Sequence, residues 1–98
     1  MARLTVVFWR DIPAQVLEGK GRSALRVHLD ARFEAAIDRA AMAAGLAGTD
    51  DYLAQWRRRS AEADSAAVLA ARIEAEYDPD RLRALAAAGG RDPRMTQG

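Results

Sequence analysis

The sequence predicts an α+β fold, with a small two- or three-stranded antiparallel sheet followed by about four helices. Short apolar and alternating segments come first in the chain, and segments with helical spacing come after them. Strands that precede helices, rather than alternating with them, are typical of α+β domains. A length of 98 residues suits one domain. We place it at residues 1–90 and expect a flexible C-terminal tail over residues 91–98.

Three segments have strand patterns. The run Leu4–Trp9 is β-branched and aromatic, and its continuous apolar character indicates a central strand covered on both faces. The next strand, Ala14–Glu18, follows a proline that has no N–H to donate, so we expect it to be an edge strand or to begin at that proline. Gly19-Lys20-Gly21 is a plausible hairpin loop. Leu25–Leu29 alternates apolar and polar residues, which predicts a half-buried third strand.

Helical spacing and capping residues define the segments that follow. Asp30 is a good N-cap for a first helix, and Gly45 is a natural residue to end it. Asp78-Pro79 supplies an N-cap followed by a proline in the first turn, which favours a short last helix that ends at Gly89-Gly90. The first and third helices are expected over about Ala31–Ala44 and Asp64–Tyr77.

A second helix is expected to begin after Thr49. Asp50 and Asp51 would lie in its first turn and Arg57–Arg59 in its last turn, and both placements suit the helix dipole. Tyr52, Leu53 and Trp56 would form its apolar face. This helix would therefore have a solvated basic end.

Composition excludes several classes of function. There is no cysteine, so disulfides, thiolate catalysis and cysteine-ligated metals are excluded. The formal net charge is +1, which gives no strong argument for binding nucleic acid or an acidic membrane. No apolar run has membrane length, and none has the features of a signal peptide. We expect a soluble cytoplasmic protein.

Trp9-Arg10-Asp11 is the most distinctive local feature. One interpretation is a packed corner at a strand end, where Trp9 covers the sheet and the charged residues hold the turn. The other is a partner-binding patch, because Trp and Arg are common in interface hot spots. Gln15 would extend this patch, and Trp56 and Arg57 from the second helix would share its surface. We expect substitution of Arg10 to weaken a partner more than it lowers stability.

The sequence contains no convincing catalytic or metal constellation. His28 is the only histidine, and neither cysteines nor a convergent carboxylate pattern accompanies it. It could act as a general base in a small enzyme, but the sequence offers no nucleophile for it. We expect no metal and no cofactor.

One alternative is a dimeric DNA-binding protein of the ribbon-helix-helix type. A strand with alternating residues precedes two helices, and Arg26 and His28 would enter the major groove. Asp50 and Asp51 argue against it, because they occupy the helix N-terminus that would have to hold a phosphate. Such binding would also be sensitive to salt.

Several stretches together resemble the small bacterial virulence factor domain family, over roughly Leu4 to Gly90. The specific parts are WRDIPAQ in the first stretch and the Tyr-Leu-x-x-Trp run of DDYLAQWRR. LDARFEAAIDRAAMAAGL and EYDPDRLRAL contribute less specific helical matches.

The resemblance implies a fold and a broad role without a mechanism. The family name records a phenotype in pathogens, although standalone members also occur in bacteria that are not pathogens. In larger members the domain stands beside helical repeats and a scaffold-type domain, which implies an interaction or accessory role. The resemblance brings no catalytic residues. We therefore expect a non-enzymatic module that binds a protein partner.

Overall fold

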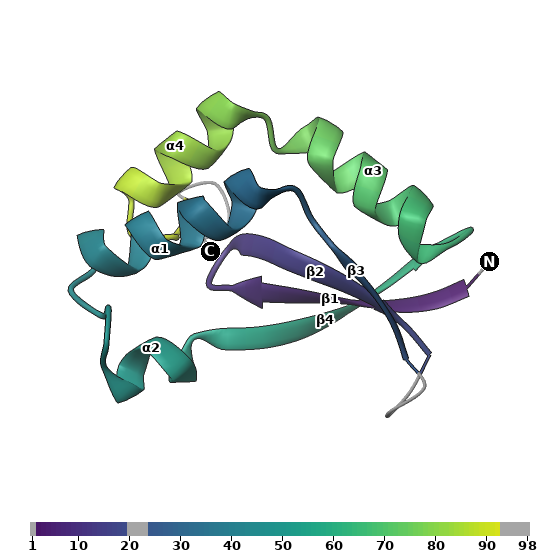
Figure 1. Ribbon diagram of the computed structural model, residues 1–98, viewed down its shortest axis with the longest axis horizontal. Helices are drawn as coiled ribbons and strands as arrows, with labels where there is room; N and C mark the ends of the chain where they lie inside the picture. The colour runs from purple at the N-terminus through teal and green to yellow at the C-terminus, as the bar shows by residue number, and fades with distance from the viewer. Residues whose placement is uncertain (1, 20–23, 93–98) are drawn as a thin grey trace.

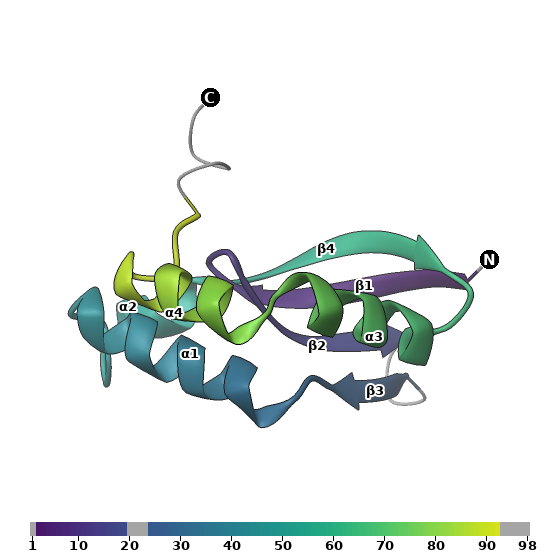
Figure 2. The same cartoon turned by 90° about the horizontal axis from the view of Figure 1, so that it is seen from above.

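The α+β class is confirmed by a computed structural model, which describes residues 2–19 and 24–92. Its elements are β1 (Ala2–Trp9), β2 (Ile12–Glu18), β3 (Leu25–His28), α1 (Ala31–Ala43), α2 (Asp50–Ala54), β4 (Trp56–Ala63), α3 (Ala66–Glu76) and α4 (Pro79–Ala87). The sheet is antiparallel with the order β3-β2-β1-β4. Figures 1 and 2 show α1, α3 and α4 on one face of this sheet, and α2 beside its end.

The fourth strand corrects the expectation of two or three strands. The predicted second helix ends at Ala54 after five residues, and β4 begins at Trp56. Arg57–Arg59 therefore lie in a strand and not in the last turn of a helix. β4 pairs with β1 along its whole length, from Ala2 opposite Ala63 to Trp9 opposite Trp56. This pairing outweighs the helix propensity of alanine, arginine and glutamate.

The positions of the other strands follow from their pairing. β1 is central, as its apolar run predicted, but the described helices cover one face of the sheet and not both as expected. β2 begins at Ile12 and includes Pro13, which lies opposite Phe8 before the pairing with β3 begins. β2 is therefore an internal strand and not an edge. β3 is an edge strand, and Leu25 at its start is 58% exposed. Most of the predicted loop Gly19-Lys20-Gly21 lies outside the described residues.

The predicted helix caps are mostly confirmed. The backbone N–H of Tyr52 donates to Thr49 Oγ1 at 3.3 Å, and that of Arg81 donates to Asp78 Oδ1 at 2.8 Å. Gly45 has a positive φ of 72° directly after α1, where the backbone must turn away. Asp30 occupies the N-cap position of α1 but makes no side-chain cap, because its carboxylate instead pairs with Arg32.

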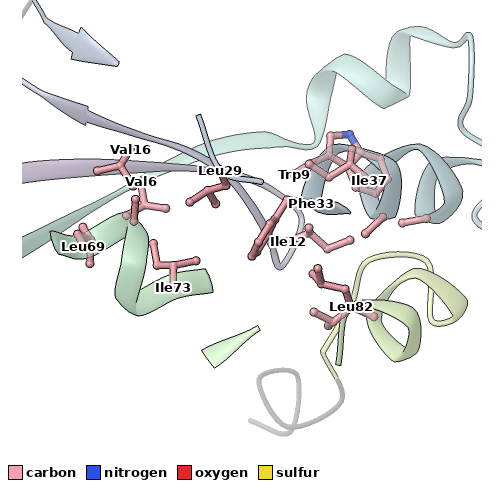
Figure 3. Packing of buried hydrophobic residues seen from close by; sticks show 14 of the residues in the cluster. Val6, Trp9, Ile12, Val16, Leu29, Phe33, Ile37, Leu69, Ile73 and Leu82 are labelled. Carbon is pink, nitrogen blue, oxygen red and sulfur yellow. The ribbon is translucent and has the colours of Figure 1, made fainter. Parts of the chain in front are cut away.

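The core lies between the sheet and its helices. Figure 3 shows Val6 and Val16 with Leu69 and Ile73 at one end, and Trp9 with Ile37 at the other. The predicted apolar faces of α1, α3 and α4 are buried there. The packed chain continues past α4, because Asp92 is buried at 6% exposure. The rest of the predicted tail, residues 93–98, lies outside the described residues.

Candidate functional site

The predicted partner-binding residues gather at one end of the sheet, in two different surroundings. Arg10 and Asp11 contact the segment after α4, and Arg57 pairs with Asp11. Gln15 and Trp56 line a groove on another side. We call the first group, together with Gln55 and Gly89 to Asp92, the polar corner. The two surroundings have different chemistry.

Trp9 is part of the core. Its side chain is 0% exposed, and its Nε1 donates to the backbone oxygen of Tyr52 at 2.9 Å. The Trp9 and Tyr52 rings lie 5.5 Å apart between centroids. A Cβ on Gly90 would come within 2.9 Å of the Trp9 ring, so the backbone there packs directly on the indole. Trp9 has no free surface to offer a partner, and packing accounts for it.

Arg10 fastens the β1–β2 turn to two other elements. Its Nε donates to Gln55 Oε1 at 3.1 Å, and its Nη1 donates to the Gly89 carbonyl at 3.0 Å. Its backbone adopts a positive φ of 53°, which is uncommon for a residue with a side chain. Burial and the nearby Arg91 lower the pKa of Arg10, and Asp11 opposes this. These contacts favour the packed-corner interpretation of Arg10, and a weakened partner on its substitution stays a prediction.

Asp11 holds three parts of the chain together. Its carboxylate, 3% exposed, accepts from Arg57 Nη2 at 2.5 Å and from the backbone N–H of Asp92 at 2.7 Å. Its own N–H donates to the Gly90 carbonyl at 2.9 Å. The Arg57 side chain remains 38% exposed. Asp11 therefore joins the turn to β4 and to the segment after α4.

The other side of the sheet has a face that no helix covers. Residues opposite one another in neighbouring antiparallel strands share a face. One such row runs across all the strands through Arg58, Val7, Gln15 and His28. The next row consists of Ser60, Thr5, Leu17 and Arg26. We call these two rows the helix-free face.

A groove of about 430 Å³ lies where this face meets α1 and α2. Its lining is mixed apolar, aromatic and polar: Ala14, Gln15, His28, Leu29, Ala31, Glu34, Ile37, Asp38, Tyr52 and Trp56. A second hollow of about 290 Å³ adjoins it and shares Gln15 and Trp56. Gln15 and Trp56 thus stand between the two hollows.

Among the described residues, the groove and the corner each hold one buried polar atom without a hydrogen-bond partner, and in the corner it is Arg57 Nε. Gln15 Oε1 is buried and has no hydrogen-bond partner within residues 2–19 and 24–92. Trp56 is 37% exposed and meets the Tyr52 ring edge-on, with centroids 6.2 Å apart. Burial raises the pKa of Tyr52, and the carboxylates of Asp38 and Glu34 raise it further. This end of the groove is therefore aromatic and negatively charged.

The structure places the two candidate DNA-contacting residues on the helix-free face. Arg26 and His28 are exposed on the edge strand β3. Glu34 and Asp38 line the same groove as His28, and these carboxylates would repel phosphates. The second helix of a ribbon-helix-helix is reduced to the short α2. These features weigh against the DNA-binding alternative.

His28, the acidic residues and the helices were the features relevant to catalytic, metal and membrane chemistry. Over residues 2–19 and 24–92, no hydrogen bond links His28 to a nucleophilic side chain, and no three His, Asp or Glu residues gather as metal ligands would. Within the same ranges, no helix is long and apolar enough to span a membrane.

Sequence reasoning missed the helical wall of the groove. Glu34, Ile37 and Asp38 lie along α1, and Glu34 and Asp38 are four residues apart, so they share one face of that helix. That spacing was visible in the sequence. Nothing local to α1 indicates that this face meets Trp56, because the contact depends on β4 being a strand.

The comparisons with known proteins identify a family. No curated protein matches the chain, and no solved structure matches it either. A family model described as virulence factor matches residues 7–86, which include every helix from α1 to α3, nearly all of α4, and all the predicted partner-binding residues. With most of its length matched, the chain belongs to the virulence factor family.

Proposed function

We propose that this domain is a non-enzymatic accessory module that binds a protein partner through the groove on its helix-free face. Arg10 and Asp11 of the polar corner do not supply the surface, since their side chains are engaged within the domain. The groove combines apolar walls, a partly exposed tryptophan and one buried acceptor without a partner, Gln15 Oε1. Interface hot spots have the same combination.

Gln15 Oε1 is the observation that carries the proposal. A buried acceptor without a partner costs roughly 1–3 kcal/mol, and folded proteins rarely keep one without a reason. A donor from a bound partner would satisfy it. Trp56 beside it offers a large, partly exposed aromatic surface, the residue type most often found at hot spots.

The test is affinity capture with matched baits, followed by reconstitution. Tagged wild type, Trp56→Ala and Val68→Ala are incubated with native extract, with and without nuclease treatment, and bound proteins are identified by mass spectrometry. Val68 is an exposed apolar residue on α3 and does not line the groove, so Val68→Ala is the control. A candidate partner is then purified and titrated calorimetrically against each variant.

A purified partner that binds wild type and Val68→Ala equally, and Trp56→Ala at least tenfold more weakly, supports the proposal. A partner lost equally from both variants would place binding elsewhere. Capture that disappears with nuclease, together with salt-sensitive duplex binding that depends on Arg26 and His28, would favour the DNA-binding alternative. Melting temperatures of all baits exclude unfolding as the cause.

A further inference from the structure

β4 leaves one edge of the sheet open. It stands last in the strand order, and among residues 2–19 and 24–92 it pairs only with β1. At eight residues it is a long edge strand, and most of its side chains are exposed. Such a strand presents a row of free backbone N–H and C=O groups, which is a template for pairing with another chain.

The charges along β4 are divided between its two halves. Arg57–Arg59 occupy the first half, and Glu62 lies in the second. Arg57 is already paired with Asp11, and Arg59 lies over the Phe8 ring. Arg58 and Glu62 have no ion-pair partner among the described residues. They lie on the same face, because their β1 neighbours Val7 and Arg3 alternate with the core residues Leu4 and Val6.

We propose that β4 pairs antiparallel with β4 of a second copy of this chain, about a two-fold axis at Ser60. In this register Arg58 lies opposite Glu62 of the partner subunit, and the symmetry makes the pair twice. Opposite charges directly across two strands stabilise their pairing. The strand is thus complementary to itself.

Other registers are less favourable. An axis at Arg59 would place that residue against its own copy, and an axis at Glu62 would do the same with carboxylates. Parallel in-register pairing would stack all the arginines against arginines. Directly opposed like charges destabilise a pair of strands. Within β4, only the register centred on Ser60 pairs Arg58 with Glu62.

The proposed dimer extends the sheet across both subunits. A two-fold axis perpendicular to the sheet keeps the helices of both copies on one side. The helix-free faces then form one continuous surface on the other side, and the open edge disappears. This proposal is independent of the groove and of what the groove binds.

The test measures molar mass by sedimentation equilibrium on the full chain, from about 1 µM to about 300 µM. Wild type should show a concentration-dependent dimer that weakens with added salt. Arg58→Glu and Glu62→Arg should each raise the dimer dissociation constant about tenfold or more, because each places like charges together twice. Arg83→Glu, on the exposed face of α4, is the control for a change of net charge.

A mixture of the two charge variants gives the decisive result. In a heterodimer, the carboxylate introduced by Arg58→Glu on one chain meets the guanidinium introduced by Glu62→Arg on the other. An equimolar mixture of the two variants should therefore dimerise again. Recovery in the mixture also shows that both variants are folded, although Glu62→Arg faces Arg3 within its own sheet. A wild type that stays monomeric, a dimer unaffected by either substitution, or a mixture that fails to recover would overturn the proposal.

Discussion

Residues of the polar corner and of the groove lie close together in the β1–β2 hairpin, yet their side chains make different contacts. Arg10 bonds to Gln55, and Asp11 bonds to Arg57 and to the segment after α4, so both side chains make their hydrogen bonds inside the domain. A few residues along β2, Gln15 has a buried oxygen that the described chain does not pair. The tryptophans divide in the same way, with Trp9 buried and Trp56 partly exposed. Residue type alone therefore does not distinguish architecture from a binding surface, and the contacts and exposure of each side chain have to be compared.

Asp11→Ala should have the largest effect on stability. It leaves Arg57 without its carboxylate and the backbone N–H of Asp92 without its acceptor. Removing one partner of a buried ion pair destabilises a fold by about 3–5 kcal/mol, and the exposure of Arg57 places this case near the lower end. Urea unfolding measures the change. Asp11→Asn keeps an acceptor and should lose less, so equal losses would contradict this role for the charge.

Gly90→Ala tests the contact between the corner and Trp9. Gly90 has φ of 89°, and an added Cβ would lie 2.9 Å from the Trp9 ring. We expect a loss of about 2–4 kcal/mol from strain and overpacking together. Gly48→Ala is the matched control, because Gly48 also has a positive φ of 76° but open space around it, and it should lose only about 1 kcal/mol. Thermal unfolding that gives the same loss for both would exclude the close contact.

Arg10→Ala should lower the free energy of unfolding by about 1–2 kcal/mol, through the lost bonds to Gln55 and Gly89. It should leave affinity for a groove partner unchanged. Arg10→Gly separates the stability lost with the side-chain bonds from the cost of the strained backbone, since glycine adopts the positive φ without strain. An Arg10→Ala domain of full stability that loses its partner would return Arg10 to the binding surface.

How far the sequence could predict this molecule is clearest in β4. The capping signals correctly located the start of α2, but they could not locate its end. Trp56–Ala63 is rich in helix formers, and its strand conformation comes from pairing with β1, which is distant in the chain. Three predicted strands were already enough to give a central β1 a neighbour on each side, so nothing in the sequence required a fourth strand. The groove was unpredictable for the same reason, because β4 brings Trp56 to α1.

Gln15→Met tests whether the buried oxygen of Gln15 is unpaired in the free domain. Methionine has a similar shape and removes the unpaired oxygen, so the free energy of unfolding should stay the same or rise by about 1 kcal/mol. Binding of a groove partner should weaken at the same time. Chemical denaturation and calorimetric titration of the same preparation measure both quantities. A marked loss of stability would mean that Gln15 is satisfied within the fold, and the main support for the groove would be gone.

Tyr52→Phe has the smallest effect at neutral pH and tests the electrostatics of the groove wall. Burial, with Asp38 and Glu34, raises the pKa of Tyr52, so the folded protein holds the phenol proton more tightly than the unfolded chain does. The unfolded tyrosine loses its proton near pH 10. The resulting stability is complete below that pH and is lost as the pH rises through the folded pKa. Unfolding free energies measured at neutral pH and up to about pH 11 should therefore fall less steeply in Tyr52→Phe.

Tyr77, whose pKa is also raised chiefly by burial, retains its own contribution, so Tyr77→Phe is the matched control away from the groove. If Tyr52→Phe leaves the alkaline slope unchanged while Tyr77→Phe reduces it, then neither burial nor the carboxylates of Asp38 and Glu34 raise the pKa of Tyr52 in solution, and the environment assigned to that end of the groove is wrong.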